Sequence, residues 1–397
     1  MKRRQFVRGA LAGAVSVGSA AALAATPRPH AAAPILRRSG ARQSASAPQA
    51  APKSPSSDGV PRRGVNLGAW LVLEKWMTPS VFRDTDAEDE YTLCTALGAA
   101  KATERLNRHR ETFITADDFR WIQERGLNAV RLPVGYWALR GAPAPFVPAE
   151  RFVDFAFEQA QKNGLQVLLD LHGAPGSQNA WDHSGRSGTL GWHTDPKNIK
   201  DTLSVLEEFA RRYGKHPALW GIQLLNEPRW DVPIDTLKTF YKDAYARVRS
   251  HLAPGAVVVI HDGFRPFAWK DFLKGPEYAN VLLDTHLYQA YTEEDRKRTA
   301  QEHVAFALDR TKHLAAMGQQ LPTMVGEWSL GTPPEVWRGQ SPFQIEAGKR
   351  GYGAAQLLSY ENTRGWFYWS YKLENDSDWS FRHCVERGWL PNRFRPQ

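Results

Sequence analysis

Two glutamates, each at the end of an apolar run of strand length, are the residues of this chain best suited to do chemistry. Glu227 closes the run of residues 219–226, and Glu327 follows the run of residues 322–326. Two buried parallel strands that both end in an acid suggest a pair of facing carboxyl groups. One of them can protonate a leaving oxygen while the other attacks carbon, which is the minimal equipment for cleaving a glycosidic bond with retention. The pair therefore predicts a sugar hydrolase.

After residue 60, short apolar runs alternate with longer stretches of helical periodicity, the pattern typical of βα units and a parallel sheet. Eight strands are predicted, at residues 63–70, 128–135, 165–172, 219–227, 256–262, 281–288, 322–328 and 365–371. Eight is the number that closes a TIM barrel. An open doubly wound sheet would need fewer strands and a glycine-rich phosphate loop after the first, and the sequence has no such loop. We therefore expect an α/β fold with a single (β/α)8 TIM barrel.

Polar side chains follow the apolar part of most of these strands, at the face where barrel enzymes keep their chemistry. They are Arg131, Asp170, His172, Asn226, Glu227, Asp284, His286, Tyr288, Glu327 and Trp369. Burying so many polar groups at one mouth would be costly unless they paired with each other and with a ligand. Asp170 and Asp284 are expected to support the others rather than to touch a substrate.

Net charge separates the first 62 residues from the rest of the chain. Residues 1–62 hold ten Lys and Arg residues and one acid, Asp58, which accounts for the whole formal net charge of +9. From Arg63 onward, 41 basic residues meet 41 acidic ones. Because the high isoelectric point belongs to the start of the chain, binding of nucleic acid by a basic domain surface loses its main support.

The start of the chain has the pattern of an export signal. Arg3 and Arg4 precede an Ala/Gly-rich stretch, residues 10–25, that is too short and too weakly apolar for a membrane span. It resembles a bacterial twin-arginine signal, and a basic amphipathic helix lying on a membrane is the alternative. We expect a signal peptide (1–25), an Ala/Pro/Ser-rich disordered linker (26–59) and a catalytic domain (60–397). The mature protein is then expected in the periplasm or outside the cell, without stable membrane insertion.

Cys94 and Cys384 are the only cysteines. An oxidising periplasm would permit a disulfide between them, and two buried thiols fit the sequence equally well. The sequence lacks the Cys/His spacings of metal sites, so neither a metal nor a cofactor is expected. A metal site built at the barrel mouth from His172, His286, Asp170 and Glu227 is the alternative.

Four segments together resemble glycoside hydrolase family 5 and, more narrowly, its exo-β-1,3-glucanase branch. They are RGVNLGAWLVLE (63–74), DLHGAPGSQN (170–179), LNEP (225–228) and GEW (326–328). The likeness runs from about residue 61 to Pro391, and the HGAPGSQN stretch is much more specific than LNEP. Ala69 is a departure, since that branch usually has a second glycine there.

The resemblance implies roles for the residues at the barrel mouth. Glu227 is the implied acid/base, which must hold a proton, and Glu327 the implied nucleophile, which must stay ionised. Arg131 and Tyr288 would hold Glu327 as an anion, by charge and by a hydroxyl hydrogen bond. Asn226 would bind the sugar 2-hydroxyl, an interaction that can strengthen in the oxocarbenium-like transition state.

The resemblance also implies further contacts with sugar. His172 and His286 would hydrogen-bond around the cleavage subsite, with Trp369 as its apolar floor, and Glu74 would bind hydroxyls of the terminal sugar. The family places an aromatic pair that grips the next sugar at the positions of Trp181 and Tyr291, and both ring types can stack on a pyranose face.

The predicted function is a retaining exo-β-1,3-glucanase that releases glucose by double displacement through a covalent glycosyl-enzyme. It is expected to be a monomer whose partner is a β-glucan. Transglycosylation is a possible side reaction, because a sugar can replace water at the second step. The alternatives are the same mechanism on a β-1,4- or β-1,6-glucan or an aryl or lipid glucoside, a non-catalytic glycan-binding protein, and a metal-dependent hydrolase.

Overall fold

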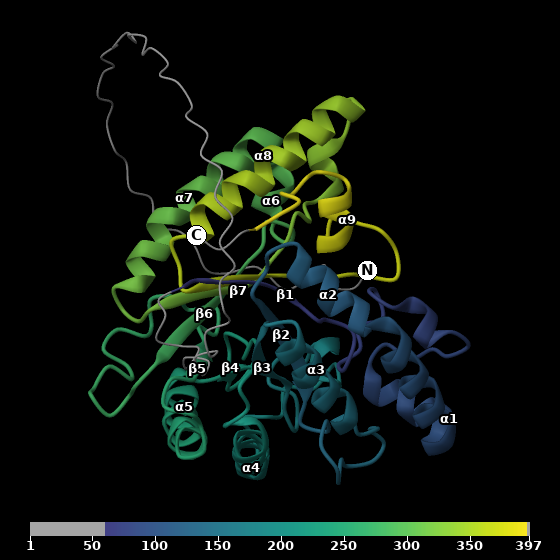
Figure 1. The fold of residues 1–397 in the computed structure, drawn as a ribbon, viewed down its shortest axis with the longest axis vertical. Helices are drawn as coiled ribbons and strands as arrows, with labels where there is room; N and C mark the ends of the chain where they lie inside the picture. The colour runs from purple at the N-terminus through teal and green to yellow at the C-terminus, as the bar shows by residue number, and fades with distance from the viewer. Residues whose placement is uncertain (1–59, 395–397) are drawn as a thin grey trace, which may run out of the picture. The chain divides into compact units, whose positions relative to one another are not determined.

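Eight parallel strands close into a barrel in which each strand pairs with the next in the chain and the last pairs back to the first (Figure 1). The structure is a computed structural model that describes residues 60–394. Its strands are β1 (Arg62–Asn66), β2 (Ala129–Gly135), β3 (Gln166–Gly173), β4 (Leu219–Gln223), β5 (Val257–His261), β6 (Val281–Leu287), β7 (Thr323–Trp328) and β8 (Gly365–Tyr368). The predicted TIM barrel is thus confirmed. The predicted signal peptide and linker lie outside the described residues.

Helices surround the barrel and follow most of its strands (Figure 1). They are α1 (Glu90–Phe113), α2 (Ala116–Glu124), α3 (Glu150–Lys162), α4 (Pro196–Tyr213), α5 (Ile234–Arg249), α6 (Glu293–Lys297), α7 (Ala300–Gly318), α8 (Pro342–Tyr360) and α9 (Phe381–Glu386). Short 3-10 helices lie at Pro79–Phe82, Asp182–Ser184 and Pro334–Trp337. None of the helices in residues 60–394 is both long and apolar enough to cross a bilayer.

The segment between β5 and β6 departs from the regular βα alternation. Residues 262–280 form turns and no helix, because Gly263 and Phe264 have φ angles of 60° and 59° and Pro266 and Pro276 cannot donate a helical hydrogen bond. The chain therefore returns to β6 through an irregular loop that begins beside the barrel mouth.

Three strands are shorter than predicted at their carboxyl ends. β1 ends at Asn66 instead of residue 70, β4 at Gln223 instead of 227, and β8 at Tyr368 instead of 371. Ala69 and Glu227 have φ angles of 54° and 42°, which no regular strand accommodates. Apolar composition continues past the point where the backbone leaves the sheet, so the sequence pattern overestimated these strands.

The lower part of the barrel interior is a packed apolar layer. Its buried residues are Ala129, Leu168, Trp220, Val257, Val259, Leu282, Met324 and Phe367. A larger cluster fills the space between the strands and the helices, with Val130, Val167 and Val258 among its members. Neighbouring residues on one strand thus point to opposite sides, as the two-residue period of a strand requires.

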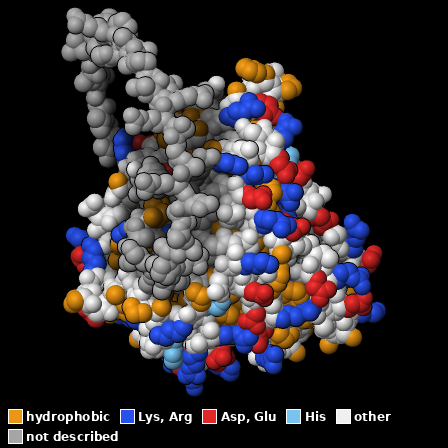
Figure 2. Space-filling view, viewed as in Figure 1, with side chains coloured by type: hydrophobic (Ala, Val, Ile, Leu, Met, Phe, Trp, Pro, Cys, Tyr) orange, Lys and Arg blue, Asp and Glu red, His pale blue; other side chains and the backbone are white. Residues whose placement is uncertain are grey.

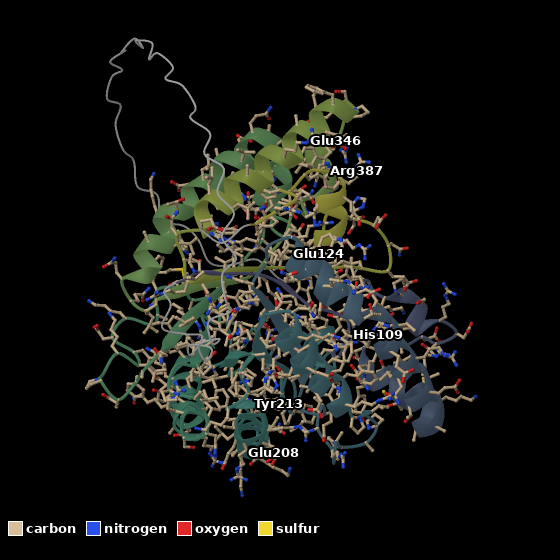
Figure 3. All side chains as sticks on the ribbon, in the orientation of Figure 1. His109, Glu124, Glu208, Tyr213, Glu346 and Arg387 are labelled. Atoms are coloured by element: carbon tan, nitrogen blue, oxygen red, sulfur yellow. The ribbon has the colours of Figure 1, made fainter. Side chains whose placement is uncertain are left out.

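The outer surface carries both signs of charge. Figure 2 shows Lys and Arg side chains interspersed with Asp and Glu over the visible face of the described residues, in keeping with the balanced charge predicted after residue 62. Some pairs join neighbouring elements: Glu346 of α8 pairs with Arg387, just after α9, and accepts a 2.8 Å hydrogen bond from Trp389 (Figure 3).

Both cysteines are buried free thiols. Cys94 packs with Leu93 and Leu106 in a cluster near the start of the described chain, whereas Cys384 lies 3.3 Å from the hydroxyl of Tyr368. Burial raises the pKa of each thiol to about 12. Of the two readings left open by the sequence, two unpaired thiols is the one observed.

Candidate active site

The polar residues at the strand ends converge because they share the inward face of their strands with the apolar layer. On β2, Arg131 is two residues beyond Ala129, and on β3, Asp170 and His172 follow Leu168 at the same period. Side chains two residues apart on a strand point the same way. The apolar layer therefore closes the barrel below, and the polar layer above it forms the floor of a site at the carboxyl ends of the strands.

Glu327 reaches this face through a bulge in β7. Thr285 pairs with Val325 while His286 pairs with Glu327, so β7 has one extra residue at Gly326. A bulge shifts the two-residue period by one and turns the Glu327 side chain inward. A side chain at position 326 would collide with the Asp284 carboxylate, and that carboxylate accepts the Gly326 N–H. A glycine is therefore needed where the bulge forms.

Glu227 is positioned by an unusual backbone conformation. Its φ of 42° is in the left-handed region, which costs a non-glycine residue about 1–3 kcal/mol unless the surroundings impose it. The Gln178 amide donates to the carbonyls of His172 (2.8 Å) and Asn226 (2.9 Å), and the Asn179 amide donates to the carbonyl of Glu227 itself (3.2 Å). The most specific motif of the sequence thus holds the Glu227 backbone in place.

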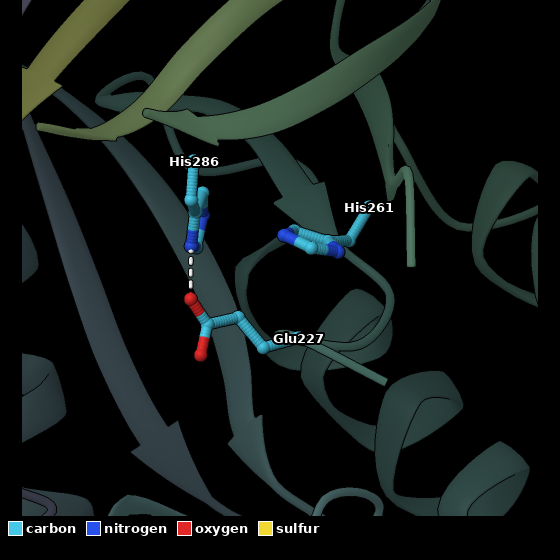
Figure 4. Close-up of side chains that lie close together, drawn as sticks. All are labelled: Glu227, His261 and His286. Carbon is cyan, nitrogen blue, oxygen red and sulfur yellow. Dashed lines mark hydrogen bonds and ion pairs between the residues drawn. The ribbon is translucent and has the colours of Figure 1, made fainter. Parts of the chain in front are cut away.

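The two carboxylates meet on either side of His286. The Nδ1 atom of His286 lies 2.7 Å from Oε1 of Glu227 (Figure 4) and 3.4 Å from Oε2 of Glu327. The two glutamate oxygens can therefore be no farther apart than the sum of these distances, about 6 Å. Retaining glycosidases hold their carboxyl groups about 5–5.5 Å apart, and inverting ones about 6.5–9.5 Å apart. The geometry fits double displacement.

Arg131 organises the floor of the site. Its fully buried guanidinium donates to Glu327 Oε1 (3.0 Å) and to the side-chain oxygen of Asn226 (2.7 Å), and it pairs with Asp170 (3.0 Å). The remaining donors reach Asn66 and Gln223. Because the guanidinium fork is rigid, these contacts fix the nucleophile and the neighbouring amide relative to one another.

The Glu327 carboxylate has a second donor in Tyr288, whose hydroxyl lies 2.7 Å from Oε2. Burial raises the pKa of Glu327, and the negative charge of Glu227 raises it further, whereas the charges of His286 and Arg131 oppose both. The resulting pKa lies above the ordinary glutamate value. Protonation of Glu327 is therefore expected to reduce activity as the pH falls.

His286 has a carboxylate oxygen within hydrogen-bond distance of each ring nitrogen. Burial would lower its pKa, but the charges of Glu327 and Asp284 raise it well above the ordinary value, and its Nε2 lies 3.1 Å from Asp284. Burial also raises the pKa of Glu227, but the hydrogen bond and charge of His286 outweigh burial and hold that pKa below its usual range. His286 is thus one hydrogen bond away from Glu227 as a source of the proton, and the assignment of Glu227 as the acid/base stays a prediction.

His172 and Trp369 form the opposite side of the floor. The two rings are parallel, with centroids 5.4 Å apart and an interplanar angle of 7°. His172 Nδ1 lies 2.7 Å from Asp170, and its Nε2 lies 3.4 Å from the Asn226 amide. Asp170, which also pairs with Arg131, therefore orients a residue of the site, in line with the supporting position expected for it.

The remaining predicted residues lie farther from the two carboxylates. Tyr291 contacts Tyr288 and Trp379, with centroids 5.6 and 6.1 Å away. Glu74 is buried and accepts a 2.7 Å hydrogen bond from the indole of Trp76. The Trp76 ring packs in turn on Trp379 at 5.5 Å. Glu74 and Tyr291 thus belong to one aromatic wall on the Glu327 side of the site.

Trp181 belongs to a different wall. Its ring lies 5.5 Å from that of His183, whose Nε2 is 3.4 Å from Oε2 of Glu227. Trp181 is therefore on the Glu227 side, and Tyr291 is on the Glu327 side. The two predicted stacking residues therefore belong to different walls of the site, and their grip on one sugar stays a prediction.

Sequence reasoning missed two histidines beside Glu227. His183 lies in a polar loop without periodic pattern, so no sequence signal marked it. His261 is the last residue of β5. Its signal is the same as for the other site residues, a polar side chain directly after the apolar part of a strand. Its ring lies 4.5 Å from that of His286, nearly perpendicular to it.

Glu227, His261 and His286 also form the one group in residues 60–394 whose ligand atoms all lie within 4.8 Å of one another (Figure 4). It differs from the predicted metal alternative, which used Asp170 and His172. Both nitrogens of His286 already have carboxylate partners, so a cation would have to displace one of these hydrogen bonds. The cluster therefore fits proton transfer better than cation binding.

Comparison with known proteins agrees with this geometry. The family model of cellulase (glycosyl hydrolase family 5) matches residues 96–375. Curated relatives include a glucan 1,3-beta-glucosidase of Blumeria graminis, 36% identical over 83% of this chain and 86% of the relative. A probable glucan 1,3-beta-glucosidase A of Emericella nidulans is 37% identical over 83% and 89%.

Solved structures share the fold at low sequence identity. The crystal structure of rutinosidase from Aspergillus niger superposes with a TM-score of 0.71 at 19% identity, covering 83% of this chain and 98% of that one. For Thermotoga maritima Cel5A the TM-score is 0.53 at 15% identity, covering 81% and 92%. With a family match over more than half its length and relatives above 30% identity, the chain belongs to glycoside hydrolase family 5.

Proposed function

We propose that this protein is a retaining glucosidase that removes glucose from the ends of β-1,3-glucan. The proposal rests on the closeness of the two glutamates. Their contacts with His286 keep Glu227 Oε1 and Glu327 Oε2 within about 6 Å of each other, a separation that suits double displacement. The choice of β-1,3-glucan is supported by the names of the curated relatives, with which the chain aligns over 83% of its length.

In the first half of the reaction, an oxygen of Glu327 attacks the anomeric carbon while the glycosidic bond to the leaving oxygen breaks. The leaving oxygen takes a proton from Glu227. Transfer of the His286 proton across the 2.7 Å hydrogen bond produces the required neutral acid. Asn226, which accepts a hydrogen bond from Arg131, binds the 2-hydroxyl of the sugar as its ring becomes oxocarbenium-like.

In the second half, water attacks the same carbon and gives a proton to Glu227, and the bond to Glu327 breaks. The carboxylate that leaves regains its negative charge facing Arg131 and Tyr288, whose donors stabilise that charge. Two displacements at one carbon restore the β configuration. A sugar hydroxyl that replaces water gives transglycosylation.

The test is a time course with β-1,3-, β-1,4- and β-1,6-gluco-oligosaccharides in which products are resolved by mass and anomeric configuration. Release of β-glucose one unit at a time, fastest from the β-1,3 series, supports the proposal. Mixed oligomers as first products would refute exo action, and preference for another linkage would refute the substrate. α-Glucose as first product would refute retention.

Two controls separate the remaining classes of function. Glu327→Gln should abolish hydrolysis and keep oligosaccharide binding, whereas a non-catalytic glycan-binding protein would show no hydrolysis to lose. Activity that is unchanged after dialysis against a chelator would argue against a metal-dependent hydrolase, and loss restored by one divalent metal would favour it.

We also propose that the protein is exported through a twin-arginine signal and acts as a monomer. Export is supported by the Arg3–Arg4 pattern and the small-residue stretch that follows it. Replacement of both arginines by lysine should retain the full-length chain in the cytoplasm, as fractionation would show. Light scattering of the mature protein gives the oligomeric state.

A further inference from the structure

An aromatic triad extends outward from the acid/base side of the site. It is formed by Trp181, Trp230 and Phe264, which come from the loops after β3, β4 and β5. The three rings are mutually adjacent, with centroids 6.0 Å apart for the two indoles and 5.9 Å apart for each indole and the phenyl ring. Each ring meets its neighbours at an angle of 53° to 75°.

Trp230 is one of two exposed tryptophans in residues 60–394, the other being Trp76. Its exposed fraction is 37%, whereas eight other tryptophans of residues 60–394 are buried. An exposed indole beside two further aromatic rings forms an apolar patch on the surface, and such patches mark sites of ligand binding. Such a patch suits the apolar face of a pyranose ring, and the charged pair of Arg229 and Asp231 on either side of Trp230 in the chain offers polar atoms to hydroxyls.

The loop that carries Trp230 is held in place. Arg229 binds Asp231 through two hydrogen bonds of 2.7 and 2.6 Å, and the Arg229 N–H donates to the carbonyl of Gln178 (3.1 Å). Arg265 donates to the carbonyl of Val232 at 3.0 Å. A ring on a fixed loop loses little conformational freedom when a ligand binds, which favours affinity.

The position of the triad defines which part of a glucan it would contact. Trp181 reaches Glu227 through His183, and Phe264 reaches it through His261, whose ring is 5.3 Å away. The acid/base protonates the leaving oxygen, so groups beyond it face the leaving portion of the substrate. Trp181 is then nearest to the first sugar of that portion, and Trp230 lies one ring farther out.

We propose that Trp230, supported by Trp181 and Phe264, binds the second sugar on the leaving-group side and makes the enzyme selective for chains of three or more sugars. The inference rests on the proposed function and deepens it. It concerns chain length and not linkage.

The test compares Trp230→Ala with the unchanged protein on β-1,3-linked di-, tri- and tetrasaccharides and on an aryl β-glucoside. We expect kcat/KM to fall about five- to tenfold for the tri- and tetrasaccharide, the loss of one aromatic contact. The disaccharide and the aryl glucoside have no second leaving-side sugar, so their rates should stay unchanged. Trp230→Phe should restore much of the loss.

Two further variants serve as controls. Trp76→Ala removes an equally exposed indole from the other wall, where it holds Glu74, and should affect all substrates alike. Phe343→Ala removes a ring that is 78% exposed at the start of α8 and should affect none. Equal losses for the di- and trisaccharide in Trp230→Ala, or no loss for either, would overturn the inference.

Failure of this inference can be told apart from failure of the proposed function. If another linkage proves to be the substrate, the chain-length comparison is made in that series, and a length-dependent loss still supports the role of Trp230. If β-1,3 oligosaccharides are cleaved without such a loss, the proposed function stands and the outer subsite is refuted.

Discussion

Tyr288→Phe tests the assignment of Glu327 as the nucleophile. The change removes one hydroxyl, which donates a 2.7 Å hydrogen bond to Glu327, and leaves the ring contacts with Trp379 and Tyr291 in place. Glu327 keeps its 3.0 Å contact with Arg131. The variant therefore isolates a single hydrogen bond to a carboxylate.

The effect should differ between the two halves of the reaction. Glu327 loses its negative charge when it attacks carbon and regains it when the glycosyl-enzyme is hydrolysed. A hydrogen bond to a charged group contributes about 1.5–3 kcal/mol, so loss of about 2 kcal/mol from the second transition state slows hydrolysis of the intermediate roughly 30-fold. The first step loses less, because the same bond also stabilises the attacking carboxylate.

Pre-steady-state kinetics with an aryl glucoside measure both steps. We expect kcat to fall about 30-fold, kcat/KM to fall much less, and a burst of the aryl product to appear as the glycosyl-enzyme accumulates. Intact-mass spectrometry should show the added glucosyl group on the protein. Tyr245→Phe is the control, because that hydroxyl bonds to the carbonyls of residues 277 and 279, away from the site. An unchanged kcat without a burst would refute the role of Glu327 or of its hydrogen bond.

Three other variants test the proton arrangement, the support of the acid and the stability of the barrel. Activity should fall at low pH as Glu327 is protonated, because its pKa lies above the ordinary value. It should also fall at high pH as His286 loses its proton, well above the usual histidine pKa. In His286→Asn the alkaline limb of kcat/KM against pH should move to lower pH, and an unmoved limb would contradict the role of His286 as the proton source. Gln178→Ala removes three buried hydrogen bonds and should cost about 3 kcal/mol in urea unfolding together with most of kcat, so stability loss with full activity would argue against positioning. Burial raises the pKa of Asp118, but Lys372 outweighs it and holds the pKa below its usual range, so the stability it contributes is present above the unfolded-state pKa and is lost as pH falls through the folded-state pKa. Asp118→Asn should lower the urea midpoint at pH 7 by an amount equivalent to about 2 kcal/mol and leave kcat unchanged, and the difference from the unchanged protein should shrink in acid.

The sequence predicted the barrel because eight apolar runs of strand length alternate with helical patterns, and burial of parallel strands leaves a strong trace in composition. It also placed most of the polar residues at the mouth. Apolar composition does not mark the end of a strand where the backbone leaves the sheet but the side chains stay buried, as they do after Gln223. The predicted end of β4 is therefore four residues beyond the observed one.

The details that orient the two glutamates were not readable in the sequence. The bulge at Gly326 changes the side to which Glu327 points, and the left-handed backbone of Glu227 depends on amides from a distant loop. Both are tertiary effects that local residue pattern does not encode. The raised pKa of His286 depends in the same way on the charges of Glu327 and Asp284, which only the folded structure brings beside it.

Burial of the two thiols bears on how the folding of the chain depends on its redox surroundings. Cys94 and Cys384 carry almost no thiolate at neutral pH, and only the thiolate attacks a disulfide or an oxidant. The barrel thus does not depend on oxidation of its thiols to a disulfide, and small-molecule disulfides should react only slowly with either cysteine. The fold therefore needs no disulfide, and the described barrel should be the same in reducing and in oxidising surroundings.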